Sequence, residues 1–161
     1  MKSIHSIPRK LALAIFAFVA LFNTSFGASI SDMNKDALAA MKSGKWAEAQ
    51  AILVKATNAY DARAPQLYGP RFGWFWYHRG YCEIKLGMFG DAMKSFEKCY
   101  KRYPNTKPKE GQAPSKNMYN KLSLLMWGHA AKGAEEWATS IRMYKKFLEE
   151  RDPTRDRYEK G

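Results

Sequence analysis

Few residues in this chain are of the kinds that catalyse reactions or bind metals. The 161 residues include three histidines and two cysteines. His78 and His129 have no cysteine or acidic residue at a spacing typical of metal ligands, so a metal site has little support. The glycines are scattered rather than grouped into a phosphate-binding loop, and no spacing indicates a Ser–His–Asp triad. We therefore expect a protein that is not an enzyme and that uses no cofactor or metal.

The chain also lacks an apolar run of the length that a membrane span requires. Leu11–Phe22 is an unbroken run of twelve apolar residues, whereas a spanning helix needs about 20. The run follows a start with three basic and no acidic residues, and a short segment after it ends at Gly27. This order is typical of a secretory signal peptide. We predict a signal over residues 1–27, cleavage before Ala28 and no stable membrane span afterwards; an uncleaved membrane anchor is the alternative.

Export would place the protein in the periplasm or outside the cell. The short signal suits bacterial export, and a eukaryotic secretory origin stays open. No cysteine follows the apolar run, so a bacterial lipoprotein is not indicated. Residues 28–161 would then form the mature chain, whose length fits one small domain.

Acidic residues are scarce relative to basic ones. The chain has 15 Asp and Glu against 27 Lys and Arg, and without residues 1–27 the net charge is about +9. Such an excess favours acidic partners. Charge alone would also allow nucleic acid, but no nucleic-acid-binding motif is present and export argues against it. We expect no nucleic-acid partner.

Helical periodicity is strongest between Trp74 and Pro104. Apolar residues recur there at steps of three and four, and Gly87 lies between two such patterns, which predicts two antiparallel helices joined by a tight turn. The stretch resembles the tetratricopeptide repeat, whose pattern is Trp, two residues, Leu-Gly, two residues, Tyr, then Ala, three residues, Phe, then Pro. Arg79 replaces the Leu of this pattern and Glu83 replaces the Tyr. The matching residues are Trp76, Gly80, Ala92, Phe96 and Pro104.

Two further segments repeat parts of this pattern. Gly44 lies 43 residues before Gly87, and Gly128 lies 48 residues after Gly80. Because the family repeat is about 34 residues long, nine residues are inserted in the first case and fourteen in the second. The implied repeats cover about residues 29–63, 73–106 and 115–154, within a domain over residues 28–161.

The resemblance implies an all-α fold in which helical hairpins stack as a short right-handed α-solenoid. The first insertion, Ala64–Phe72, contains Pro65 and Pro70 and is expected to form a loop. The third repeat is expected to begin near Ser115 and to turn at Ala134–Glu136.

The repeat register also predicts how residues pack. Cys82 and Cys99 would lie roughly 13 Å apart along the hairpin, beyond the about 7 Å that a disulfide allows, so we expect two free thiols. Small residues are expected where two helices cross closely, at Ala49, Gly80, Ala92 and Gly128. Aromatic residues are expected to fill the space between neighbouring helices at Trp46, Phe89 and Trp137.

The family binds peptides or partner proteins on a concave face formed by the first helix of each pair. The resemblance therefore implies a non-enzymatic interaction module or scaffold. One subgroup clamps the terminal carboxylate of chaperone tails with Lys and Asn, but Tyr77 and Tyr81 occupy those positions in the central repeat, so this clamp is not supported. The expected partner-binding residues are Trp74, Tyr77, Tyr81, Lys85, Asn34, Leu38, His129 and Lys132.

The function is left open at two points. The rings of Trp74, Tyr77 and Tyr81 either pack in the core or anchor a partner, which would then be an acidic or apolar-acidic peptide. The chain as a whole is either a binding module or a structural subunit, or N-terminal fragment, of a larger envelope assembly.

Overall fold

The computed structural model describes residues 29–105 and 117–150, and every regular element in those residues is helical. The predicted all-α fold is therefore confirmed. The predicted signal peptide, the expected start of the third repeat near Ser115 and the chain after Glu150 lie outside the described residues. The elements are α2 (Ile30–Lys42), α3 (Trp46–Tyr60), α4 (Ala64–Leu67), the 3₁₀ helix η1 (Gly69–Phe72), α5 (Gly73–Lys85), α6 (Phe89–Arg102), α7 (Tyr119–Gly133) and α8 (Trp137–Glu150).

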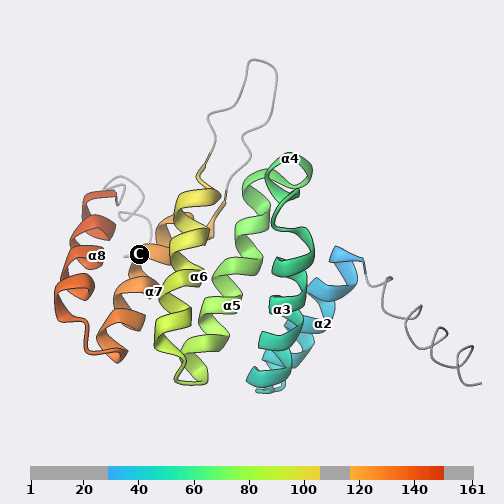
Figure 1. Cartoon of the computed structure of the whole chain (residues 1–161), viewed down its shortest axis with the longest axis horizontal. Helices are drawn as coiled ribbons and strands as arrows, with labels where there is room; N and C mark the ends of the chain where they lie inside the picture. Colours follow the sequence, from blue (N-terminus) through green and yellow to red (C-terminus); the bar gives the residue numbers. More distant parts are fainter. Residues whose placement is uncertain (1–28, 106–116, 151–161) are drawn as a thin grey trace, which may run out of the picture.

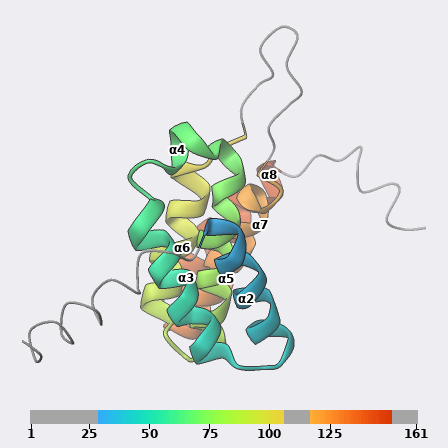
Figure 2. The ribbon, with the colours of Figure 1, turned by 90° about the vertical axis from the view of Figure 1, so that its right-hand side faces the viewer.

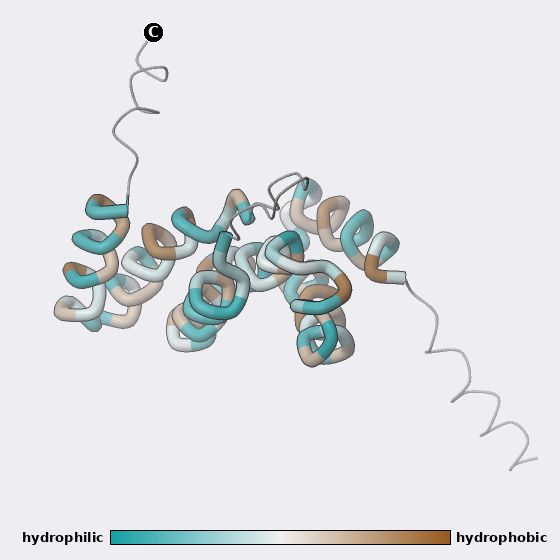
Figure 3. Tube along the Cα trace, turned by 90° about the horizontal axis from the view of Figure 1, so that it is seen from above, coloured by the Kyte–Doolittle hydropathy of each residue, from teal (hydrophilic) through white to brown (hydrophobic). Residues whose placement is uncertain are grey.

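The long helices form antiparallel pairs that stack in a row. α2 packs on α3, α5 on α6 and α7 on α8, and neighbouring pairs touch through α3 with α5 and α6 with α7. Figure 1 shows the row from α2 to α8, and Figure 2 looks along it. Seen from above, the row is curved (Figure 3). The predicted stack of helical hairpins is confirmed, and we call α2, α5 and α7 the first helices of the pairs and α3, α6 and α8 the second helices.

Tight turns join the two helices of each pair. Gly44 and Gly87 have φ angles of +71° and +74°, a left-handed conformation that glycine adopts without strain. Glu135 holds the corresponding place in the turn from α7 to α8, with a φ of 62°. The predicted turns at Gly87 and at Ala134–Glu136 are thus confirmed.

Glycines inside two first helices make room for aromatic rings of the second helices. A Cβ atom on Gly80 would lie 2.8 Å from the Phe96 ring, and one on Gly128 would lie 2.5 Å from the Tyr144 ring. The prediction that both residues must be small is supported by these distances. The close neighbour is a ring rather than a crossing backbone, because interiors are packed to contact and the ring fills the space between two helices.

Aromatic residues at the start of two second helices contact the next pair. The Trp46 and Tyr81 rings meet edge to face at 5.9 Å between centroids, and a Cβ on Gly133 would lie 2.5 Å from the Phe89 ring. The same prediction is wrong for Trp137, which is 58% exposed. The reason is that no first helix follows α8 in the described residues.

The insertion Ala64–Phe72 is not the loop that its prolines predicted. It forms α4 and η1, with proline as the second residue of each. Proline is tolerated there because the first backbone N–H groups of a helix have no partner to lose. The insertion is also packed in place, since Ala64 and Phe72 are buried.

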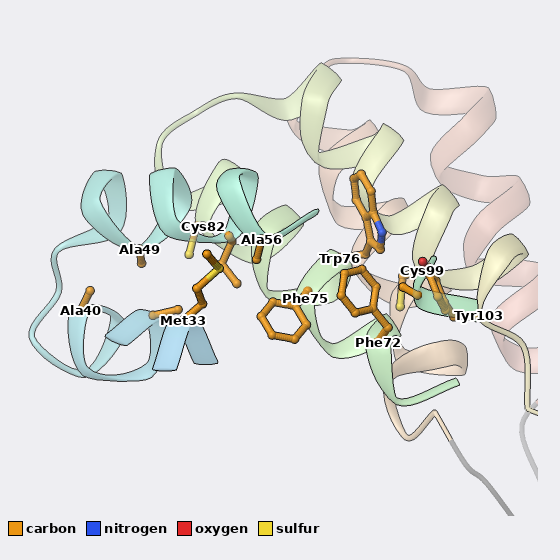
Figure 4. Packing of buried hydrophobic residues seen from close by; sticks show 13 residues of the cluster. Met33, Ala40, Ala49, Ala56, Phe72, Phe75, Trp76, Cys82, Cys99 and Tyr103 are labelled. Carbon is orange, nitrogen blue, oxygen red and sulfur yellow. The ribbon is translucent and has the colours of Figure 1, made fainter. Parts of the chain in front are cut away.

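The main core joins α2, α3, α5 and α6, and Figure 4 shows its side chains. Cys82 and Cys99 are buried in separate parts of it and are free, as predicted. Burial raises the pKa of both thiols to about 11. Both cysteines are therefore packing residues rather than reactive ones.

The two departures from the family pattern, Arg79 and Glu83, bind each other. Arg79 Nε donates to Glu83 Oε1 at 2.9 Å, and the Glu83 carboxylate is fully buried. Ser95 Oγ donates to Glu83 Oε2 at 2.6 Å, and an Arg79 guanidinium nitrogen donates to Thr57 Oγ1 at 3.0 Å. The network therefore links α3, α5 and α6 at a position where the family has apolar and aromatic side chains.

Candidate functional site

A cavity of about 550 Å³ opens between the first helices of the three pairs. It lies at the N-terminal end of these helices and is bordered by η1. We call it the aromatic groove. Its lining residues are Ile30, Ser31 and Asn34 of α2, Tyr68, Arg71 and Phe72 of the insertion, Trp74 and Phe75 of α5, and Asn117, Met118 and Tyr119 at the start of α7.

The groove forms where the connections between pairs meet. Each pair is antiparallel, so all three first helices begin on the same side of the row (Figure 1). The insertion leads into α5 on this side, and Asn117 leads into α7. Asn117 is fixed there because its Nδ2 donates to the Tyr103 carbonyl at 2.8 Å and its Oδ1 accepts from the Tyr119 backbone N–H at 3.0 Å.

Stacked aromatic rings build one wall of the groove. The Phe72 ring stacks on Tyr68 at 6.0 Å between centroids and on Phe75 at 5.0 Å. The Trp74 ring meets Phe75 edge to face at 4.9 Å. Because each ring is held by its neighbours, this wall is in place without a ligand, and such preformed apolar surfaces are typical of binding sites.

Two polar groups of the groove are unused. The Oδ1 atom of Asn34 is the one buried side-chain oxygen or nitrogen in the described residues that has no hydrogen-bond partner. Arg71 is exposed and forms no ion pair within residues 29–105 and 117–150. Among the described lining residues none is acidic. A buried amide oxygen without a partner costs free energy, so a ligand that donates a hydrogen bond to Asn34 Oδ1 would remove that cost.

The structure brings only two of the predicted partner-binding residues into the groove, namely Trp74 and Asn34. Tyr77 lies outside its lining, with its ring 5.7 Å from Phe96 and 4.7 Å from Tyr119 between centroids. Tyr77 therefore packs mainly against α6 and α7, and burial raises its pKa.

Tyr81 and Lys85 lie nearer the other end of α5. The Lys85 Nζ atom is 5.4 Å from the centre of the Tyr81 ring and 5.7 Å from the centre of the Trp46 ring. These distances allow cation–π contacts. The aromatic stripe predicted along α5 is thus divided between the groove, the core and this second cluster.

The remaining predicted residues do not line the groove either. Leu38 is exposed on α2, and Lys132 is exposed on α7. His129 is exposed and pairs within its own hairpin, since its Nδ1 atom lies 3.1 Å from the Tyr144 hydroxyl.

Sequence reasoning missed groove residues that include Tyr68 and Arg71 of the insertion before α5, and Met118 and Tyr119 at the start of α7. The insertions themselves were the available signal. Both insertions follow a second helix and precede a first helix. Antiparallel pairing is therefore expected to place them beside the same set of helix ends. Two insertions at one end predict a built-up surface there.

His78 lies directly behind the groove. Its ring stacks on Trp74 at 4.2 Å and meets Tyr119 edge to face at 5.0 Å, and its Nδ1 lies 2.9 Å from the Trp74 carbonyl oxygen. Burial lowers the pKa of His78 below its usual value near 6.5. The neutral ring therefore supports the groove wall.

Other kinds of site find no support in the part of the chain that the structure describes. No group of three or more His, Cys, Asp and Glu residues in residues 29–105 and 117–150 is arranged to hold a metal ion. None of the described helices has the length and apolar character needed to cross a membrane.

Comparison with known proteins yields one family match. A family model for the tetratricopeptide repeat matches residues 75–106, which covers α5 from its third residue and all of α6. No curated protein matches the chain. The matched hairpin and its helical neighbours support a protein of the tetratricopeptide-repeat type.

Proposed function

We propose that this chain is a non-enzymatic interaction module that holds a segment of a partner protein in the aromatic groove. A tetratricopeptide repeat suggests protein–protein interaction in general. The observation that carries the finer proposal is the groove itself, which combines a preformed aromatic wall with the unpaired Oδ1 atom of Asn34. The pairs α2–α3 and α7–α8 act in this proposal as further repeats that complete the surface.

The bound segment carries an acidic residue beside an apolar one. Arg71 is the cation of the groove, and it has no carboxylate partner among the described residues. The aromatic wall would receive the apolar side chain, and a backbone N–H of an extended segment would donate to Asn34 Oδ1. The chain's excess of 27 basic over 15 acidic residues would attract such a segment at long range.

The test is selection from a random peptide display library with the chain as bait. We expect enrichment of peptides with an acidic residue next to an apolar or aromatic one. Their affinity should fall about tenfold or more in the variant Arg71→Glu with Met118→Asp. The first change repels the acidic residue of the peptide, and the second places a carboxylate that is costly to dehydrate where the apolar side chain binds. Leu67→Asp on α4, outside the groove and 62% exposed, is the matched control and should bind normally. Selected peptides that bind the double variant as well as the parent chain would contradict the proposal.

We further propose that the protein is exported, with residues 1–27 as a cleaved signal, and acts in the periplasm or outside the cell. The order of a basic start, an apolar run and a short polar end supports this. N-terminal sequencing of the protein from its native type of host should begin at Ala28. Recovery of intact Met1 in the membrane fraction would contradict cleavage and favour an anchor.

A structural role in a larger envelope assembly is the second candidate. The exposed apolar side chains of α8, which include Trp137, favour it. If this role is the right one, a stable complex isolated from the envelope should dissociate when Trp137 is replaced by a charged residue and should be unaffected by changes at Arg71.

A further inference from the structure

An apolar stripe runs along the outer face of α8. Trp137, Ile141 and Leu148 are 58%, 56% and 60% exposed. Their spacings of four and eleven residues are close to whole numbers of helical turns, so the three side chains project on the same side. Half of an amphipathic helix is normally solvated, and a stripe of large apolar side chains on that half marks an interaction surface.

The repeat register identifies the stripe as a stacking face. Trp46 and Phe89, which occupy the place of Trp137 in the two preceding pairs, contact Tyr81 in α5 and Gly133 in α7 respectively. Trp137 therefore occupies a place that is covered by a further helix wherever one is present. Stacked repeats normally end in a helix with a polar outer face, whereas the outer face of α8 carries the three large apolar side chains of the stripe beside its charged ones.

Charged residues beside the stripe change sign along the helix. Arg142 and Lys145 come first, and Glu149 comes after them; none of these three forms an ion pair in residues 29–105 and 117–150. A shallow cavity of about 500 Å³ runs beside them and is lined by Ile141 as well. Arg142 and Glu149 are seven residues apart, so they lie on the same side of the helix but too far apart to pair with each other.

The order of Arg142 and Glu149 makes this part of the face complementary to itself. If two copies of α8 lie antiparallel with Ile141 opposite Leu148 of the other copy, Arg142 of each lies close to Glu149 of the other. Lys145 then lies near the axis and faces its own copy, and its long side chain can extend into solvent there. A parallel arrangement would instead place all three charged residues opposite their own copies, so every charge contact would join like charges. A two-fold axis generates each contact twice, which is the property of an isologous interface.

We propose that α8 pairs with α8 of a second copy of this chain, antiparallel about a two-fold axis, and so forms a homodimer. The stripe supplies the apolar centre, and the two Arg142–Glu149 pairs fix the direction. One face of a 14-residue helix is small beside the about 1,200–2,000 Å² that stable interfaces bury. The dimer is therefore in equilibrium with the monomer. The groove takes no part, because no residue of α8 lines it.

Sedimentation equilibrium of the protein as isolated from an exporting host tests this directly. The average mass should rise from that of one chain towards that of two as the concentration increases. Ile141→Glu should weaken association by about tenfold or more, because it places a charge at the apolar centre. Leu67→Glu, at an equally exposed apolar position on α4, should leave the association constant unchanged. A mass of one chain at every concentration would overturn the proposal.

Charge reversal decides whether the partner is a second copy. Arg142→Glu and Glu149→Arg should each weaken association, because each creates two like-charge contacts. The double variant should restore it, since the pairs form again with their signs exchanged. The melting temperature of each variant, measured where the protein is monomeric, should match that of the parent chain. Failure of the double variant to recover would show that α8 binds something else, such as the chain's own residues 151–161 or another protein.

Discussion

At the scale of single residues, Arg79 and Glu83 act as one unit. Glu83 is completely buried and receives hydrogen bonds from Arg79 and Ser95. Arg79 also bonds to Thr57 in α3. A buried carboxylate that loses its cation is strongly destabilising, whereas replacement of the whole pair by packed apolar groups is often neutral.

We therefore predict strong coupling between these two positions. Arg79→Leu alone leaves Glu83 buried without its cation and should lower the free energy of unfolding by about 2–4 kcal/mol, a value reduced because Arg79 is partly exposed. Arg79→Leu with Glu83→Tyr, the residues of the family pattern, should recover most of this loss. Urea unfolding of both single variants and the double variant measures the coupling energy. Additive losses would show that the pair contributes nothing as a unit.

The same two residues show how far residue-level reasoning reaches. Gly80 was predicted to be small because two helices cross closely there, and the structure shows that the Phe96 ring fills the space beside it. The family pattern gives no information on how Arg79 and Glu83 interact, because it has Leu and Tyr at these two positions. Their pairing across one helical turn became evident only with Ser95 and Thr57 in place, and these come from other helices.

At the scale of elements, His78 connects α5 to the start of α7. Its ring lies between Trp74 and Tyr119, and its pKa is lowered by burial from the usual value of 6.5. Below about pH 6.5 the unfolded chain therefore binds more protons at this site than the folded chain, so stability is lost as the pH falls through this range. Well above that pH, His78 is neutral in both the folded and the unfolded chain, so it does not make stability depend on pH.

The corresponding prediction is a stability difference between neutral and mildly acidic solution that depends on His78. The urea midpoint of the parent chain should fall between about pH 7.5 and about pH 5.5. His78→Gln, which keeps a hydrogen-bond donor for the Trp74 carbonyl, should show a smaller fall. Comparison of the two slopes removes the contribution of other titrating groups. Equal slopes would mean that His78 titrates as it does in the unfolded chain.

Helices and turns were predicted better than connections. Periodicity and glycine placement locate α5, α6 and the turn at Gly87, because those signals are local. The insertion Ala64–Phe72 was misjudged because proline disfavours the interior of a helix but suits its first turn. Its burial against α5 depends on Phe72, whose ring contacts Phe75 of α5 and Tyr103 just after α6.

At the scale of the whole molecule, the stacked hairpins were predictable and the binding surface only partly so. The resemblance pointed to the first helices, and Asn34 and Trp74 do line the groove. Arg71 lies in the insertion before α5 and Met118 lies directly before α7, outside the residues that the family pattern specifies, so only the arrangement of the pairs places them together. The surface of α8 illustrates the same limit, because the exposure of Trp137 depends on whether another helix covers the last pair.

The stacked helices have two sets of ends, and these differ in how far the sequence that connects the helices can change. At one end the chain turns through a left-handed residue in each pair, namely Gly44, Gly87 and Glu135. An added residue in these turns would break the fit between the paired helices. At the other end the connections already vary in length, and residues 68, 71, 72, 117 and 118 line the groove. The molecule therefore has a constant end and a variable end. Divergence or engineering of the residues between pairs can change what is recognised while the stack that presents it stays the same.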